Sequence, residues 1–313
     1  MLLKARRVVV AKWMPLLPLI IVLAACNQSN KPSFRVFASP EDASTALMEA
    51  AKSEDQNALL AIFGAESKAI IFSGDAVQDK AAVDKFNLAY GVMHRWRKMP
   101  DGTQVLLIGA DNFPFPIPLR KGDAGQWSFD TAAGKEEILT RRIGRNELAV
   151  IEVCGAVADA QAEYFSQPHE GASKGQFALK FISDSGKQNG LYWESPEGQP
   201  KSPLGPLAAF ATAEGYNTKP NSHIPFHGYY FHMLTRQSAH AQGGAKDYVV
   251  NGQMVDGFAF VAYPAEYGNS GIMTFIINQD DMLLQKDLGT TTIQTATAMS
   301  EFDPEGDWRP VEQ

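Results

Sequence analysis

The stretch Asn146-Glu-Leu-Ala-Val-Ile-Glu-Val-Cys-Gly-Ala-Val-Ala-Asp-Ala-Gln-Ala-Glu-Tyr-Phe165 predicts the central element of the fold, an amphipathic helix. Its apolar residues recur every three or four positions, which places them on one side of a helix. The predicted face consists of Leu148, Ile151, Gly155, Ala158, Ala162 and Phe165. The helical pattern extends back to residue 133, with Gly144 as a point where the helix can break. We therefore expect a long helix over 133–165.

The chain that follows this helix has the pattern of an antiparallel sheet. Four β-like runs, each bounded by Gly, Asn or Asp, cover 228–234, 257–263, 272–277 and 282–284. Asp280-Asp281 is predicted as a hairpin turn between the last two. Before them lie a strand-like run at 177–182 and a helix-like run at 206–214 that ends in Gly215. A long helix followed by an antiparallel sheet is typical of an α+β fold.

The chain that precedes the long helix gives a second α+β pattern. Ser39 and the following Pro and acids predict the start of a first helix, and further helices are expected over 55–63 and 79–96. Strand-like runs follow at 104–109, 115–119 and 126–130. We therefore predict two domains, 34–132 and 133–313, because the length allows about two. The segment 43–64 resembles the opening helices of the NTF2-like cone.

The first 33 residues are predicted to be a targeting signal followed by a tether. Four basic residues, Lys4, Arg6, Arg7 and Lys12, precede an apolar run over 14–25 that is too short to span a membrane comfortably but suits a signal peptide. The run ends Leu23-Ala-Ala-Cys26, which resembles a bacterial lipobox. That resemblance implies cleavage after residue 25, acylation of the Cys26 thiol and new amino terminus, and a polar tether over 26–33. The alternative is an uncleaved anchor, which also keeps the protein at a membrane.

The residue after Cys26 is Asn27 rather than Asp, and resemblance to the sorting rule of Gram-negative lipoproteins then implies the periplasmic face of the outer membrane. Without the four basic residues of 1–25, 24 basic residues face 35 acidic ones, so the net charge falls from −7 to −11. Such a chain lacks the basic footprint of a nucleic-acid binder. Its net charge also argues against adhesion to anionic lipid by charge. With Cys26 acylated, Cys154 is the one remaining thiol, expected in the core.

Several rare residues follow one another in a fixed order: Gly190-Leu-Tyr-Trp193, Phe226-His-Gly-Tyr-Tyr-Phe231, Gly243-Gly-Ala, Tyr248, Gly257-Phe-Ala-Phe260, Tyr263-Pro-Ala, Tyr267-Gly, Ser270-Gly271, Thr274-Phe275, Lys286-Asp-Leu-Gly289, Asp303-Pro304 and Trp308. Together they resemble an uncharacterised family of bacterial secreted and lipid-anchored proteins. The resemblance covers nearly all of the chain after the leader and supplies no catalytic residue.

The second half is also similar to the globular heads of type II secretion pseudopilins, in which an amphipathic helix is covered by a small antiparallel sheet. Filaments of such proteins need an apolar N-terminal extension of that helix. Here the preceding residues read Lys135-Glu-Glu-Ile-Leu-Thr-Arg-Arg142, which is charged. The resemblance therefore implies a pilin-like head without a polymerising stalk.

Asp303, Glu305 and Asp307 are the candidate metal ligands, because alternating carboxylates suit a hard cation such as Ca²⁺. Calcium near the end of the sheet in some pseudopilin heads adds to this interest. The pattern departs from an EF-hand, and a solvated acidic turn is the alternative. No cofactor other than this calcium is expected.

Four histidines and one serine motif are further candidates for a metal or catalytic site. His223, His227, His232 and His240 lie close in sequence, but His227 and His232 would face opposite sides of a strand, so surface or packing roles are expected. Ser173 lies in a Gly-x-Ser-x-Gly match without the flanking strand and helix of a hydrolase elbow. It is therefore predicted to lie in a flexible loop.

The candidate binding residues are Tyr229, Tyr230, His227 and Tyr267, from a dense aromatic set for which core packing is the alternative. Because no complete catalytic set was found, we expect a non-enzymatic cell-envelope lipoprotein that binds or assembles with an envelope protein. The alternatives are a periplasmic small-ligand-binding module that uses the cone of the first domain, and a hydrolase whose site is built from distant residues.

Overall fold

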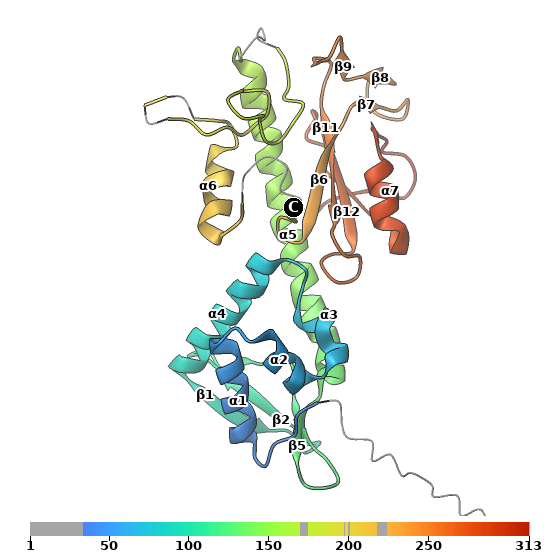
Figure 1. Ribbon diagram of the computed structural model, residues 1–313. Coiled ribbons are helices and arrows are strands. Elements are labelled where there is room, and N and C mark those ends of the chain that lie inside the picture. The colour runs from blue at the N-terminus through green and yellow to red at the C-terminus, as the bar shows by residue number, and fades with distance from the viewer. Residues whose placement is uncertain (1–33, 170–174, 197, 200, 218–223, 313) are drawn as a thin grey trace, which may run out of the picture. The chain divides into compact units, whose positions relative to one another are not determined.

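The computed structural model describes residues 34–312, apart from 170–174, 197, 200 and 218–223 (Figure 1). The predicted leader and tether, 1–33, lie outside these residues. Contacts group residues 33–313 into one unit, and helices and mostly antiparallel sheets confirm the predicted α+β class. Among the helices in the described ranges, none combines the length and apolar character that a membrane span requires.

The first part of the chain begins with helices. The helices are α1 (Pro40–Lys52), α2 (Gln56–Phe63), η1 (Ala65–Ser67), α3 (Lys68–Ile71) and α4 (Ala76–Val92). Side-chain caps fix the starts of α1, α2 and α4. Ser39 accepts a hydrogen bond from the amide of Asp42 at 3.0 Å, and Asp55 accepts one from the amide of Ala58 at 3.0 Å. These contacts confirm that the first two helices start where the sequence predicts.

The predicted helix over 79–96 is wrong at its C-terminal end. The helix α4 ends at Val92, and the next residues form β1 (His94–Lys98), which pairs with β2 (Gln104–Ile108). Pairing with β2 places Trp96 opposite the buried Leu106, so a cross-strand contact overrides the helical spacing.

The remaining strands complete a five-stranded sheet. They are β3 (Phe113–Pro114), β4 (Leu119–Lys121) and β5 (Trp127–Phe129). The order is β1-β2-β4-β5, with β3 paired to β2. The expected strand over 115–119 is therefore replaced by β3 and β4, which lie on either side of the Pro-containing segment Phe115–Pro118.

Aromatic side chains fill the space between these helices and this sheet. The ring of Phe63 lies 5.2 Å from that of Phe129, and the ring of Phe86 lies 5.6 Å from that of Phe115. Phe63 and Phe129 are buried together with Leu47 and Leu119. The interior of this part of the molecule is a packed core.

The long helix is α5 (Thr131–Ser166), and it runs through Gly144 without a break. The predicted apolar face is only partly right: Ile151 and Ala158 pack against the core, whereas Leu148 is 66% exposed and Phe165 is 37% exposed. The buried face is Val150, Val153, Cys154, Val157, Ala160, Gln161 and Tyr164. The sequence did not indicate this face because it contains the polar Gln161. The side-chain amide of Gln161 donates to the carbonyl of Ala178 and accepts from the amide of Ala178, each at 2.9 Å, and these bonds allow it to be buried.

The buried face of α5 packs against a second five-stranded sheet (Figure 1). Its strands are β6 (Tyr229–Leu234), β11 (Ala259–Pro264), β12 (Met273–Asn278), β13 (Leu284–Asp287) and β15 (Arg309–Pro310). They are antiparallel in the order β15-β13-β12-β11-β6, which confirms the predicted sheet and the hairpin at Asp280-Asp281. Phe260 and Phe275 lie in the core between helix and sheet.

Smaller elements surround this layer. They are α6 (Gly205–Glu214), β7 (Arg236–Gln237), β8 (Lys246–Asp247), β9 (Val249–Val250), β10 (Gln253–Met254), η2 (Gly289–Thr291), α7 (Thr292–Ala298) and β14 (Glu301–Phe302). Gly215 adopts a left-handed conformation that ends α6, as predicted. The expected strand over 177–182 forms only isolated bridges, Phe177 to Met254 and Ile182 to Tyr192.

Candidate functional site

A cleft between α5 and α6 brings one of the predicted binding residues, His227, to an apolar surface. Ala149, Val153 and Ala156 line it from α5, and Leu207 and Phe210 line it from α6. Glu152 and His227 add the polar groups, and the cleft has a volume of about 370 Å³. This size is in the range of small-molecule or peptide-side-chain pockets.

The position of the cleft follows from the two helices. On α5 the lining residues lie beside the buried face that contacts the sheet, and on α6 the buried Ala208 and Ala211 hold the helix in place. Phe210, which lines the cleft, is 55% exposed, and Leu148, which precedes the lining Ala149 on α5, is 66% exposed. Apolar side chains left exposed beside a hollow are typical of a contact surface.

His227 is held in a restrained conformation at the edge of this cleft. Its backbone φ is 49°, a left-handed value, and its Nε2 lies 3.4 Å from a carboxylate oxygen of Glu214. Its Nδ1 lies 3.5 Å from Nε2 of Gln78. Burial lowers the pKa of His227, and the nearby Glu214 carboxylate opposes this effect. The arrangement fixes the imidazole as a polar group beside an apolar cleft.

Asp75 connects this edge to the first part of the chain. It is fully buried; one carboxylate oxygen accepts from the amides of Val77 and Gln78, each at 3.1 Å. The other accepts from the hydroxyl of Tyr216 at 2.7 Å and the amide of Gly228 at 3.2 Å. Four donors thus satisfy a buried carboxylate, which indicates a positioning role.

A second polar connection is made by Arg142 on α5. Its guanidinium donates to the carbonyl of Ala69 at 3.4 Å, to that of Ile70 at 2.5 Å, and to the side chain of Asn269. Burial lowers its pKa, although Asp79 opposes the change. These contacts fix α5 against α3 and the 266–271 loop.

The predicted metal ligands are only partly brought together. Asp303 and Glu305 lie near each other and are joined by His240, not by Asp307. Nδ1 of His240 is 3.0 Å from Asp303, and Nε2 is 3.2 Å from Glu305. A histidine nitrogen favours Zn²⁺ over the Ca²⁺ predicted from carboxylates alone. All three side chains are well exposed, so the group also fits an ion-pair cluster.

The three predicted tyrosines do not form one site. Tyr229 is buried, and its hydroxyl donates to the carbonyl of Met273 at 2.9 Å. The ring of Tyr230 lies 5.9 Å from the ring of Tyr263, and the hydroxyl of Tyr267 lies 3.3 Å from Asp287. Of the four predicted binding residues, His227 lines the cleft between α5 and α6.

The remaining candidates are placed as follows. Cys154 is a fully buried free thiol, as expected, and burial raises its pKa well above the ordinary value. Cys26, His223 and Ser173 lie outside the described residues. His232 is on β6, where Nε2 lies 3.0 Å from the carbonyl oxygen of Met299. Sequence reasoning missed Glu214 and Gln78, which reach His227 from distant helices.

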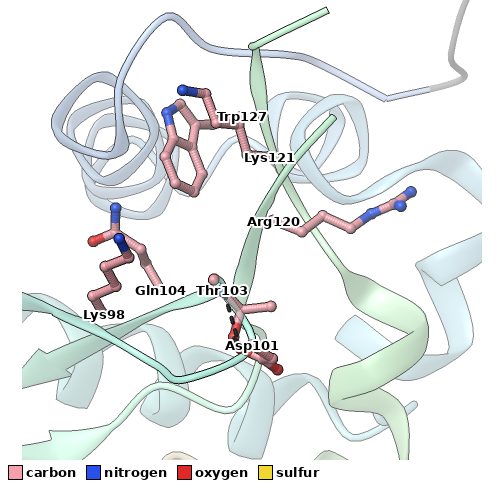
Figure 2. Close-up of a pocket in the computed structure, with 8 residues that line it drawn as sticks. Lys98, Asp101, Thr103, Gln104, Arg120, Lys121 and Trp127 are labelled. Atoms are coloured by element: carbon pink, nitrogen blue, oxygen red, sulfur yellow. Dashed lines mark hydrogen bonds between the residues drawn. The ribbon is translucent and has the colours of Figure 1, made fainter. Parts of the chain in front are cut away.

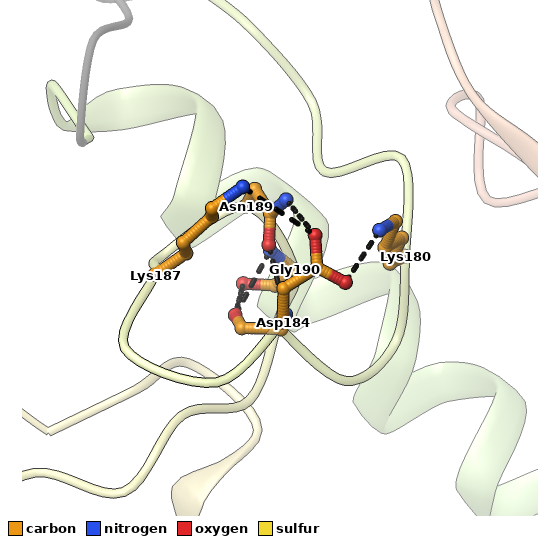
Figure 3. Close-up of polar contacts among 6 residues, drawn as sticks. Lys180, Asp184, Lys187, Asn189 and Gly190 are labelled. Carbon is orange, nitrogen blue, oxygen red and sulfur yellow. Dashed lines mark hydrogen bonds and ion pairs between the residues drawn. The ribbon is translucent and has the colours of Figure 1, made fainter. Parts of the chain in front are cut away.

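The motif Gly190-Leu-Tyr-Trp193 has a structural role. In Figure 3, Asp184 lies between Lys180 and Asn189, contacting them at 2.7 and 2.8 Å. Hydrogen bonds from Lys180 and Asn189 lower the pKa of Asp184. Gly190 packs against the backbone of Ile182 and Ser183, where a Cβ would overlap. The motif that starts at Gly190 therefore closes a loop.

These features define an α+β protein whose long helix is covered by an antiparallel sheet and borders an apolar cleft. A model of the family described as "Protein of unknown function (DUF2950)" matches residues 34–311. Because the match covers most of the 313 residues, the chain belongs to this family. No curated protein and no solved structure matches the chain significantly.

Proposed function

We infer that the protein is a non-enzymatic lipoprotein of the cell envelope, held at the periplasmic face of the outer membrane by acylated Cys26, that binds another envelope protein. The observation that supports the binding role is the apolar cleft between α5 and α6, where the lining Phe210 is exposed. The lipobox-like Leu23-Ala-Ala-Cys26 supports the anchor. The packing of α5 on an antiparallel sheet is the arrangement that the resemblance to pseudopilin heads implies.

The occupant that the cleft favours is an apolar segment that carries a basic residue. Its apolar side chains would cover Leu207 and Phe210, and its cation would meet the carboxylates of Glu152 and Glu214 at the polar edge. A small ligand inside the first part of the chain is less well supported, because the rings of Phe63, Phe115 and Phe129 fill that interior.

The binding proposal is tested with a photoreactive amino acid placed at Phe210 of the full chain in its own membrane. We expect one crosslinked envelope protein, with the crosslink mapped to an apolar segment that contains Lys or Arg. The matched control is the same amino acid at Leu88, which is 73% exposed on α4. Glu152→Gln should reduce the crosslink at Phe210. Equal crosslinking at both positions contradicts the proposal that the cleft is the binding site.

The anchor and the absence of catalysis have separate tests. Metabolic labelling with palmitate should mark the full chain and not its Cys26→Ala variant. Saturable ester or peptide hydrolysis that His227→Ala or Ser173→Ala abolishes would replace the binding proposal with the hydrolase alternative.

A further inference from the structure

A second cleft lies at the end of the first sheet and is rich in cations. Figure 2 shows Lys98, Gln104 and Lys121 grouped with Trp127, whereas Arg120 points away from them. These residues come from β1, β2, β4 and β5, which meet where the β1–β2 hairpin turns. The cleft has a volume of about 430 Å³.

The strand register explains this grouping. Lys98 is paired with Gln104, and Lys121 is paired with Trp127, so each pair shares one face of the sheet. The ammonium of Lys121 lies 5.6 Å from the centre of the Trp127 ring, a cation–π distance. Two lysines and a half-buried indole therefore face the same hollow.

Asp101, which lines the cleft, and Asp130, which directly follows β5, are already engaged. The carboxylate of Asp101 accepts from the amide of Thr103 at 2.9 Å and from its hydroxyl at 2.7 Å, and these bonds lower the pKa of Asp101. Asp130 lies 3.5 Å from Arg120 and caps α5. Within the part of the chain that the structure describes, Lys98 and Lys121 have no carboxylate partner. Their charges are available to an anionic ligand.

The number of residues between Cys26 and Phe37 limits how far this cleft can lie from Cys26. Trp127 and Phe37 exchange two backbone hydrogen bonds of 2.8 Å each. Phe37 follows Cys26 by eleven positions, so an extended tether can separate the anchor from Phe37 by at most about 40 Å. An acyl chain on Cys26 would thus confine the cleft to the neighbourhood of the membrane surface.

We propose that this cleft binds the anionic phospholipid headgroups of the membrane that holds the anchor, and thereby orients the protein on that membrane. The proposal rests on the lipid anchor of the proposed function, not on the partner. Lysine ammonium groups bind phosphate, and tryptophan prefers the interface between headgroups and acyl chains. The net charge of −11 averages over the chain, whereas screening within about 8 Å at physiological salt lets a local cation pair act by itself.

The test uses the acylated full chain in vesicles of phosphatidylcholine, with or without phosphatidylglycerol, that carry a shallow nitroxide quencher. Trp127 is one of four tryptophans after residue 25, so we expect quenching of up to about a quarter of the fluorescence in the anionic vesicles only. Trp127→Phe should remove that fraction. High salt should also remove it, because screening weakens the lysine contacts.

The decisive variant is the pair Lys98→Gln with Lys121→Gln, compared with Lys52→Gln and Lys85→Gln, which change the net charge equally on exposed helical positions. We expect the first pair to lose the phosphatidylglycerol effect and the second to keep it. Equal quenching in both kinds of vesicle, or equal loss in both pairs, overturns the proposal. If the chain proves unacylated, the proposed lipid anchor is wrong. Co-sedimentation of the chain with anionic vesicles would still support the headgroup site if Lys98→Gln with Lys121→Gln abolished it. The absence of any co-sedimentation would overturn the headgroup site.

Discussion

Gly271 lies directly against the phenol ring of Tyr229, so closely that a Cβ at position 271 would overlap the ring and its hydroxyl. Tyr229 cannot move aside easily, because it is buried in the core and its hydroxyl donates to the carbonyl of Met273 at 2.9 Å. Both residues belong to the sequence pattern that resembles the family. The contact therefore gives a packing reason for two residues of that pattern.

Gly271→Ala is expected to destabilise the protein by about 1–3 kcal/mol, because the added methyl group overpacks a rigid contact. Urea unfolding followed by circular dichroism measures the change. Gly155→Ala is the matched control, since a Cβ there meets nothing within 4 Å on α5. It should be neutral or stabilising by roughly 0.5–1 kcal/mol. Equal losses in the two variants would contradict the packing argument.

Tyr216→Phe is expected to cost about 1.5–3 kcal/mol, because it removes a hydrogen bond of 2.7 Å to the buried carboxylate of Asp75. Tyr267→Phe removes a bond of 3.3 Å to Asp287 near solvent and should change stability by less than about 0.5 kcal/mol. Urea midpoints of both variants provide the comparison. If the two variants lose equal stability, the hydrogen bonds around Asp75 do not fix Tyr216 and the amide of Gly228 to the start of α4.

Stability is expected to fall as the pH rises above about 10. Burial raises the pKa values of Tyr216, Tyr229 and Tyr248, so the unfolded chain loses their protons at a lower pH than the folded one. The folded state then binds more protons, and the free energy of unfolding decreases by up to about 1.4 kcal/mol per pH unit for each such tyrosine. Urea unfolding across this range measures the slope, which Tyr229→Phe should reduce.

The sequence predicted the elements that local signals determine. Ser39, Asp55 and Gly215 mark helix ends by capping, and the β-like runs after residue 228 pair as expected. Prediction failed where distant contacts decide. Trp96 enters a strand because it pairs with β2, and the buried face of α5 includes Gln161 because Ala178 satisfies its amide.

The candidate site was predictable to the same degree. His227 was recognised as a binding candidate, but Gln78, which contacts it, lies 149 residues away in the sequence. The sequence indicates Asp303, Glu305 and Asp307 as candidate ligands, whereas His240 joins the first two only because β7 and β14 pair side by side. Such groupings depend on topology that local patterns do not encode.

Zn²⁺, and not Ca²⁺, is expected to raise the melting temperature, because the cluster combines the imidazole of His240 with two carboxylates. Its ligand atoms lie within 4.8 Å of one another, whereas tetrahedral zinc with bonds of about 2.0–2.1 Å needs roughly 3.4 Å, so the exposed side chains must close in. We expect weak binding that adds about 1 kcal/mol, or roughly 2–4 °C, at saturating metal. His240→Ala should abolish the shift and Asp307→Ala should not; a Ca²⁺ effect lost in Asp307→Ala would restore the original carboxylate prediction.

Thiol counting tests the core and the anchor in one experiment. Cys154 is fully buried, and burial raises its pKa, so the native protein should not react with a thiol reagent at neutral pH. If Cys26 is acylated, the native full chain isolated from membranes has no reactive thiol, and the denatured chain has one of the two cysteines. Cys26→Ser should then leave both counts unchanged, and Cys154→Ala should remove the thiol seen after denaturation. One fast thiol in the native chain that Cys26→Ser removes would contradict acylation, and one that Cys154→Ala removes would contradict the packing of α5 on the sheet.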